Sequence, residues 1–202
     1  TYDGPPVLSH IDLRIPAGST LGLIGRVGSG KTTLARLIPR LIEAGEGDLL
    51  IDGIPVRQWP LGELREAIGY VSQTPFLFSK TVAANVAYGV EEAGAEDMRD
   101  AAEGAQLAAE VERFAQGFET LVGERGVTLS GGQKQRATLA RDILRQPRIL
   151  ILDDALSAVD THTEEAILRY LRGATTDCTT IIIAHRISTL RAADQIVVLD
   201  EG

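Results

Sequence analysis

Short runs of apolar residues alternate along the chain with longer segments in which apolar residues recur every three or four positions. The short runs lie at residues 21–24, 149–152, 180–184 and 196–199. Strands of a parallel sheet are covered by helices on both faces, so they are apolar throughout rather than at alternate positions. The periodic segment at residues 31–41 predicts a helix directly after the first strand. The pattern therefore predicts an α/β protein with a parallel sheet.

The middle of the chain has a different pattern. Residues 48–51 and 68–71 are further predicted strands, but residues 75–147 are rich in Ala, Glu and Arg and predict helices interrupted by glycines. We expect residues 75–147 to form a helical lobe inserted into an α/β core made of residues 1–74 and 148–202. We expect residues 1–202 to be one domain, truncated at both ends, since the sequence starts at Thr1 rather than Met.

Composition narrows the class of protein. With 44% hydrophobic and 24% charged residues, the 202-residue chain has the composition of a globular domain and not of a disordered one. The formal net charge of −8 argues against nucleic acid or an anionic membrane surface as a partner. Its single cysteine, Cys178, cannot form an internal disulfide. The apolar runs fall far short of the ~20 residues that a membrane helix needs.

A glycine-rich segment between the first predicted strand and the first predicted helix carries the clearest chemistry. Residues 25–32 fit the pattern G-x-x-x-x-G-K-[ST] in the strand–loop–helix context that this pattern requires. The glycines allow backbone N–H groups to surround a phosphate, Lys31 adds a full positive charge, and the Thr32 hydroxyl is a ligand for Mg²⁺. The alternative is a glycine-rich turn with a solvent-exposed lysine. The expected ATP-binding residues are Gly25, Arg26, Val27, Gly28, Ser29, Gly30, Lys31, Thr32 and Thr33.

Asp153 ends the apolar run at residues 149–152. An aspartate after a strand is often only a turn residue. At the carboxyl end of a parallel strand, however, it faces a phosphate loop, where it can hold the Mg²⁺ shell. Together the two motifs predict a nucleoside triphosphatase that binds a magnesium nucleotide.

A second motif narrows this class. Leu129, Ser130, Gly131, Gly132 and Gln133 read Leu-Ser-Gly-Gly-Gln and precede a predicted helix. On local grounds this could be a simple N-capped helix. With the phosphate loop before it and Asp153 after it, the whole chain resembles the nucleotide-binding domains of ABC (ATP-binding cassette) transporters, whose signature motif this is. The resemblance implies a RecA-like P-loop NTPase core with a small antiparallel β subdomain and an inserted α-helical subdomain.

The resemblance also implies roles for residues that the local sequence leaves open. Gln73 matches the Q-loop residue that touches Mg²⁺, and Ser157 and Asp160 match the D-loop that crosses a dimer interface. His185 matches the switch histidine that contacts the γ-phosphate, although a lone histidine after a strand is often structural. Tyr2 matches the aromatic residue that stacks on adenine.

In this family Mg-ATP lies between the phosphate loop of one domain and the signature motif of a second nucleotide-binding domain. The resemblance therefore implies such a partner, and transmembrane domains whose coupling helices dock near Phe76 and Ser79. Residues 122–126 are similar to the segment that precedes the signature in exporters, but Leu121 stands where exporters have Glu. The implied location is the cytoplasmic face of the cell membrane, as part of an integral membrane transporter.

The residue at position 154 is expected to set the rate of ATP hydrolysis at this domain's own site. Active members place Glu after the metal-binding Asp, as the base that polarises the attacking water. Aspartate is one methylene shorter, and a general base must come within ~2.6–3.2 Å of the proton that it takes, or act through one water. Either the site is slow, or a small main-chain shift restores the reach.

Asp154 together with an intact signature resembles the degenerate half of heterodimeric bacterial exporters. Such a half donates its signature to the faster site of its partner. His185 is retained, unlike in the more degenerate members, which leaves residual hydrolysis open. The other function classes are an importer ATPase subunit, a soluble ABC ATPase acting on DNA or in translation, and a regulatory module that only binds ATP.

Overall fold

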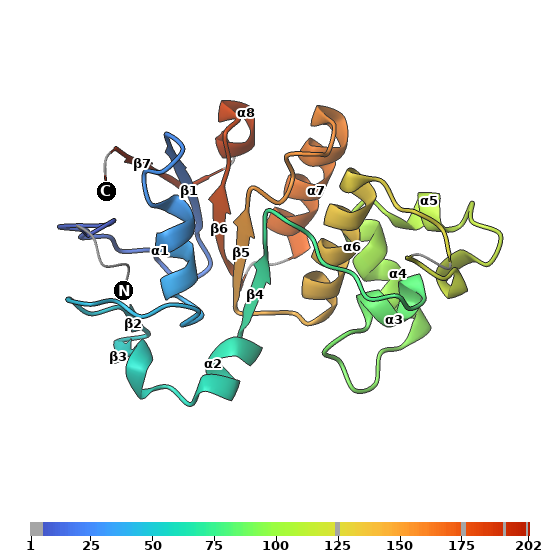
Figure 1. Cartoon of the computed structure of the whole chain (residues 1–202), viewed down its shortest axis with the longest axis horizontal. Coiled ribbons are helices and arrows are strands. Elements are labelled where there is room, and N and C mark those ends of the chain that lie inside the picture. The colour runs from blue at the N-terminus through green and yellow to red at the C-terminus, as the bar shows by residue number, and fades with distance from the viewer. Residues whose placement is uncertain (1–5, 124–125, 175–176, 192, 201) are drawn as a thin grey trace.

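The computed structural model describes residues 6–123, 126–174, 177–191, 193–200 and 202. A central parallel sheet has the strand order β4-β5-β6-β1-β7 (Figure 1). Its strands are β1 (Thr20–Gly25), β4 (Ile68–Val71), β5 (Ile149–Asp153), β6 (Thr179–Ile183) and β7 (Gln195–Leu199). Each lies within one residue of its predicted bounds, and the predicted α/β class is confirmed.

Both faces of the sheet are buried at β1, β4, β5 and β6, which explains why these strands are almost wholly apolar. In the edge strand β7, Ile196 and Val198 are exposed. In β5, Leu150 and Leu152 belong to a buried cluster that includes Ile167 of α7 (Thr161–Ala174). The intervening Ile151 belongs to a second cluster, with Ala35 of α1 (Lys31–Leu37). Successive side chains of a strand point to opposite faces, so two helical layers require apolar residues at every position.

Most of the remaining helices lie between β4 and β5 in sequence and are grouped beyond the β4 edge of the sheet in Figure 1. They are α3 (Val82–Val86), α4 (Ala95–Gly104), α5 (Ala108–Val111), the 3₁₀ helix η2 (Gly117–Glu119) and α6 (Gly131–Leu144). Gly104 allows α4 to approach α7 closely, because a Cβ there would lie 2.3 Å from the Tyr170 ring. The expected inserted helical subdomain is present.

A small antiparallel pair completes the core. It consists of β2 (Leu50–Ile51) and β3 (Ile54–Pro55), followed by η1 (Val56–Gln58) and α2 (Leu61–Glu66). Asp52 and Gly53 form the tight turn, with φ of 53° and 78°. The predicted strand at residues 48–51 is thus shorter than expected, but the antiparallel β element that the resemblance implies is present.

The first predicted helix was extended too far. α1 ends at Leu37 rather than at residue 41, and Arg40 already has a φ of 51°. Pro39 accounts for the difference, since it has no N–H to donate to the carbonyl oxygen of Ala35 and its ring clashes with the preceding turn, although Ile38 still has helical φ and ψ. The apolar periodicity continues across Pro39, so it predicts a longer helix than the backbone forms.

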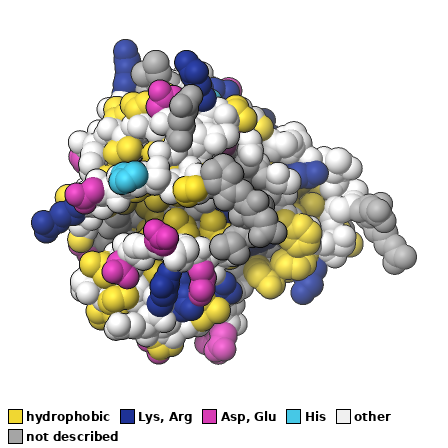
Figure 2. All heavy atoms as spheres, turned by 60° about the vertical axis from the view of Figure 1, so that its left-hand side comes forward, with side chains coloured by type: hydrophobic (Ala, Val, Ile, Leu, Met, Phe, Trp, Pro, Cys, Tyr) yellow, Lys and Arg dark blue, Asp and Glu magenta, His cyan; other side chains and the backbone are white. Residues whose placement is uncertain are grey.

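Charged side chains of both signs are interspersed with hydrophobic ones on the face of the molecule shown in Figure 2. Among the described residues, no helix combines the length and the apolar character that crossing a bilayer demands.

Asp142 of α6 is, among the described residues, the buried carboxyl group whose pKa departs furthest from its ordinary value. It is 6% exposed and lies 3.4 Å from Nη1 of Arg145. Burial raises the pKa of Asp142 to about 6, against the opposing charges of Arg145 and Arg141. The folded state therefore holds a proton between about pH 4 and pH 6 that the unfolded state has released, so this group lowers stability as the pH rises through that window.

We expect Asp142→Asn to remove this pH dependence. The interval between the pKa of 3.8 in an unfolded chain and about 6 in the folded one corresponds to about 3 kcal/mol as an upper value. The variant should therefore gain stability relative to the parent protein as the pH rises from 4 to 7. Urea unfolding at both pH values measures the difference, with exposed Asp97→Asn as the control. A difference that does not change with pH would contradict this prediction.

Candidate functional site

The loop between β1 and α1 is shaped by glycines. Gly28 and Gly30 have φ of 87° and 98°, in the left-handed region that favours glycine. Gly25 has no room for a side chain, because a Cβ there would lie 2.2 Å from the Leu199 carbonyl oxygen and 2.6 Å from Oγ of Ser29. The loop that the sequence pattern predicts is therefore a tight backbone turn at the carboxyl edge of the sheet.

Lys31 lies over this turn instead of extending into solvent. Its Nζ donates hydrogen bonds to the carbonyl oxygens of Gly25, at 2.8 Å, and Arg26, at 2.7 Å, and the residue is 7% exposed. A positive charge is thus fixed beside the N-terminus of α1, where the helix dipole also favours an anion. The arrangement can bind phosphate.

Asp153 joins the loop to the end of β5. Its Oδ1 accepts a hydrogen bond from the Thr32 hydroxyl at 3.0 Å, and its Oδ2 accepts one from the Tyr70 hydroxyl at 2.8 Å. Asp153 is 3% exposed. Burial, and then the hydrogen bond and the charge of Asp153, raise the pKa of Tyr70, so its hydroxyl is a donor at neutral pH.

The donor set fits magnesium. Mg²⁺ prefers oxygen ligands and usually takes only one or two carboxylates in addition to phosphate oxygens and water. Thr32 and Asp153 supply a hydroxyl and a carboxylate within one hydrogen bond of each other. Among the residues that the structure describes, no group of three or more His, Cys, Asp and Glu could hold a metal ion without such phosphates.

Asp154 lies at the start of the turn that follows β5. It has a φ of 51°, and its N–H donates to the carbonyl oxygen of Ile183 at 3.0 Å. Nε2 of Gln73 donates to Asp154 Oδ2 at 3.3 Å, so the structure brings these two predicted site residues together. Ser157 closes the turn, with its hydroxyl donating to the Asp154 carbonyl oxygen at 2.8 Å.

His185 is exposed and follows the end of β6. A cavity of about 100 Å³ lies between its segment and the turn after β5, and Asp154, Ser157, Glu164 and Arg186 are among its lining residues. Asp160, the other predicted D-loop residue, accepts a hydrogen bond from the Thr163 N–H at 3.0 Å and so caps the start of α7.

Arg186 ties the His185 segment to the turn that contains Ser157. Its guanidinium donates to the carbonyl oxygens of Ser157, at 3.1 Å, and Val159, at 3.0 Å, and pairs with buried Glu164 at 2.8 Å. Sequence reasoning missed Arg186, Glu164 and Tyr70, because each acts across more than twenty positions of sequence. A tyrosine inside an otherwise apolar strand was the only local signal, and it was weak.

The signature motif starts α6. Leu129 is buried, and Ser130 and Gln133 form a reciprocal capping box around the first turn. Gly132 packs on the turn after β5, since a Cβ there would lie 2.7 Å from the Ala158 carbonyl oxygen; Gly131 lies beside the same residue. Within the described part of the chain, no hydrogen bond joins residues 129–133 to residues 25–32.

An exposed aromatic cluster lies where membrane-domain contacts were expected. The ring centroids of Phe76 and Phe78 are 5.0 Å apart, and those of Phe78 and Tyr88 are 4.6 Å apart. The Arg141 guanidinium lies 5.5 Å from the Tyr88 ring centroid. Phe76 and Tyr88 are 64% and 52% exposed.

The remaining predicted site residues are placed as follows. Arg26 and Val27 are exposed at the loop tip, and Thr33 lies in the first turn of α1. Tyr2 lies outside the described residues, as do residues 124–125 of the segment that is similar to exporters.

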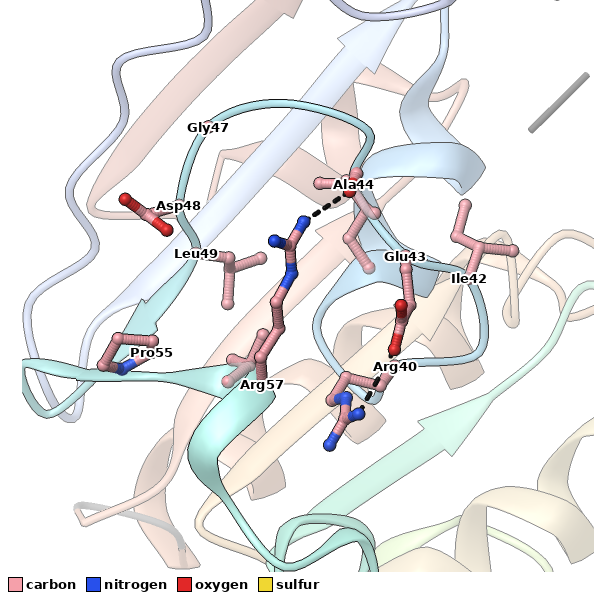
Figure 3. A pocket seen from close by; sticks show the side chains of 11 residues that line it. Arg40, Ile42, Glu43, Ala44, Gly47, Asp48, Leu49, Pro55 and Arg57 are labelled. Carbon is pink, nitrogen blue, oxygen red and sulfur yellow. Dashed lines mark hydrogen bonds and ion pairs between the residues drawn. The ribbon is translucent and has the colours of Figure 1, made fainter.

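A second cavity lies away from these residues, between the end of α1 and the β2–β3 pair (Figure 3). Its two arginines point toward partners of their own: Arg40 pairs with Glu43 at 3.2 Å, and Arg57 donates to the Ala44 carbonyl oxygen at 2.5 Å. Its volume is about 20 Å³, which is enough for about one water molecule and not for a nucleotide.

Comparison with known proteins agrees with this geometry. The family model described as ABC transporter matches residues 8–157. An ATP-dependent lipid A-core flippase of Chromobacterium violaceum is 49% identical over 197 residues, which are 98% of this chain and 34% of the flippase. The uncharacterized ABC transporter ATP-binding protein YwjA of Bacillus subtilis is 49% identical over 193 residues, or 96% of this chain and 34% of that protein.

Among solved structures, a bacterial Atm1-family ABC exporter with ATP bound superposes with a TM-score of 0.94 at 43% identity, covering 100% of this chain and 36% of that one. The chain thus spans about a third of the length of the curated relatives that it matches. The phosphate loop, the sheet that positions it and these matches show together that the chain belongs to the ABC transporter family and corresponds to its ATP-binding domain.

Proposed function

We propose that this chain is the ATPase domain of an exporter-type ABC transporter and that it binds Mg-ATP at residues 25–33. One observation carries the proposal: the Thr32 hydroxyl donates to Asp153 at 3.0 Å, and Thr32 directly follows Lys31, whose ammonium is held over the same loop. A cation, a hydroxyl and a carboxylate are the groups that bind a magnesium triphosphate in proteins, which supports the proposal. The similarity to flippases and to an Atm1-family exporter supports the exporter type.

In this proposal Lys31 binds the β- and γ-phosphates, and Thr32, Asp153 and Gln73 hold Mg²⁺. Bound Mg²⁺ supplies charge neutralisation of the phosphates. Tyr70 keeps the Asp153 carboxylate oriented, and Tyr2 stacks on the adenine. His185 contacts the γ-phosphate at the edge of the cavity that Asp154 also lines.

The site requires a second nucleotide-binding domain. The signature glycines lie against Ala158 in the turn after β5 of their own chain, and Ser130 caps its own helix. They are therefore available to a nucleotide bound by a partner, and a partner's signature would in turn cover residues 25–32. The D-loop residues Ser157 and Asp160 lie in the same turn region, which suits them to this interface.

We further propose that this chain is the slow half of an asymmetric pair. The shorter Asp154 carboxylate stands where active members have Glu, and it already accepts a hydrogen bond from Gln73. The intact capping box at Ser130 and Gln133 leaves the signature ready to serve a faster partner site.

The proposed domain arrangement follows the topology. Residues 1–74 and 148–202 form the ATP-binding core, and residues 75–147 form the helical lobe. The aromatic cluster of Phe76, Phe78, Tyr88 and Arg141 receives the coupling helices of transmembrane domains, because Phe76 and Tyr88 are exposed and both contact the ring of Phe78. The assembly would then act at the cytoplasmic face of the membrane.

Two variants of Ser130 test whether the signature meets a partner's nucleotide. Both Asp and Asn can cap α6, but only Asp brings a negative charge to the γ-phosphate. We expect Ser130→Asp to weaken ATP-driven pairing and turnover by at least roughly a hundredfold, while Ser130→Asn remains far more active. Turnover of the assembled transporter and ATP-dependent association of the domains are the measurements. Equal behaviour of the two variants would refute the proposed pairing.

A further inference from the structure

The orientation of the signature depends on the side chain of its last residue. Oε1 of Gln133 accepts a hydrogen bond from the Ser130 N–H at 2.8 Å, and the Gln133 N–H donates to Oγ of Ser130 at 3.2 Å. Whatever holds the Gln133 amide therefore also holds the backbone at Ser130.

Glu110 of α5 holds that amide. Its Oε2 accepts a hydrogen bond from Nε2 of Gln133 at 2.7 Å, and its Oε1 lies 2.7 Å from Nη2 of Arg136. Partial burial acts to raise the pKa of Glu110, but the hydrogen bond from Gln133 and the charge of Arg136 outweigh it and lower the pKa. The carboxylate is thus ionised and makes two charge-assisted contacts, which are the strong kind.

Arg136 links Glu110 to the backbone of two segments, the signature motif and the corner between α4 and α5. Its Nε donates to the carbonyl oxygen of Gly132, the second signature glycine, at 3.3 Å, and its Nη1 donates to the Gln106 carbonyl oxygen. Gln106 lies in the corner between α4 and α5 and has a φ of 55°. Arg136 is 9% exposed, so these bonds are shielded from competing water.

We propose that Glu110 and Arg136 are positioning residues for the signature motif: they hold Ser130, Gly132 and Gln133 in the orientation that meets the partner-bound nucleotide. The proposal rests on the proposed function. The body of α6 is fixed independently by buried residues such as Leu139 and Ala140. Loss of the Glu110 contacts therefore loosens the first turn of α6 and leaves the helical lobe folded.

The test compares two glutamates of the same lobe. Glu110→Gln removes the charge that pairs with Arg136, whereas Glu112→Gln breaks a surface ion pair with Arg99, of 2.7 Å, that does not touch the signature. We expect Glu110→Gln to lower turnover of the assembled transporter roughly tenfold. Mg-ATP affinity at the chain's own phosphate loop should stay unchanged. The thermal midpoint should fall by only a few degrees, because Arg136 keeps its bonds to the Gly132 and Gln106 carbonyl oxygens. Glu112→Gln should alter neither turnover nor affinity.

Two further variants, Glu110→Asp and Ser130→Asp, distinguish a failure of this inference from a failure of the proposed function. Glu110→Asp keeps the charge but shortens the reach, so it should also lose turnover. The inference is wrong if the Glu110 variants keep the turnover of Glu112→Gln while Ser130→Asp abolishes ATP-dependent pairing. That result would leave the proposed function intact. A fall in the thermal midpoint that accounts for the lost activity overturns it as well. If Ser130→Asp too is without effect, the proposed function fails and this inference fails with it.

Discussion

Replacing Lys31 with Ala is expected to weaken binding of Mg-ATP at this chain's phosphate loop by roughly a hundredfold, because the ammonium is the only full positive charge fixed within the described loop. The same change leaves the carbonyl oxygens of Gly25 and Arg26 without their donor. Both effects act on the loop itself, so the loss should appear in affinity before it appears in any later step of the cycle.

Isothermal titration of the protein with Mg-ATP measures this loss. Lys80→Ala is the matched control, since Lys80 is an exposed lysine outside the nucleotide site. An unchanged affinity in Lys31→Ala would contradict the assignment of residues 25–32 as the phosphate loop.

Asp154 is expected to limit hydrolysis at its own site. With the main chain held by the bond to Ile183, the carboxylate ends one methylene short of the position that Glu would reach, and misplacement on that scale can cost roughly a hundredfold in rate. We therefore expect Asp154→Glu to raise turnover at this site by roughly ten- to a hundredfold. Asp154→Ala should leave total turnover of the assembled transporter nearly unchanged, because the partner site carries it.

Single-site turnover of the assembled transporter, measured for both variants and for the equivalent alanine change in the partner, separates the outcomes. Asp154 has a φ of 51°, which Asp tolerates better than Glu, so thermal stability is recorded alongside. If Asp154→Ala alone abolishes turnover, the asymmetric proposal is wrong.

The parts of the site that could be predicted are those with a short continuous sequence motif. The phosphate loop and Asp153 each lie in such a motif, and short apolar runs locate the five strands of the sheet. The same apolar periodicity extended the first helix past Pro39, because periodicity reports a buried face and not where the backbone stops being helical.

Contacts between residues far apart in the sequence could not be predicted from local motifs or periodicity. Tyr70 reaches Asp153, Arg186 reaches Glu164, and Glu110 reaches Gln133 only because the fold brings different elements together. No local spacing rule connects such pairs. In the proposed arrangement the position of the signature relative to a nucleotide depends on a second chain, so no pattern in this sequence could predict it.

The most direct test of the central claim is a structure of the paired complex with Mg-ATP bound and hydrolysis blocked. The account predicts a triphosphate inside residues 25–32, Mg²⁺ beside Thr32 and Asp153, and the partner's serine and glycines on the opposite side of the nucleotide. A loop that stays empty at saturating Mg-ATP, with the Lys31 ammonium still bonded to the carbonyl oxygens of Gly25 and Arg26, would contradict it.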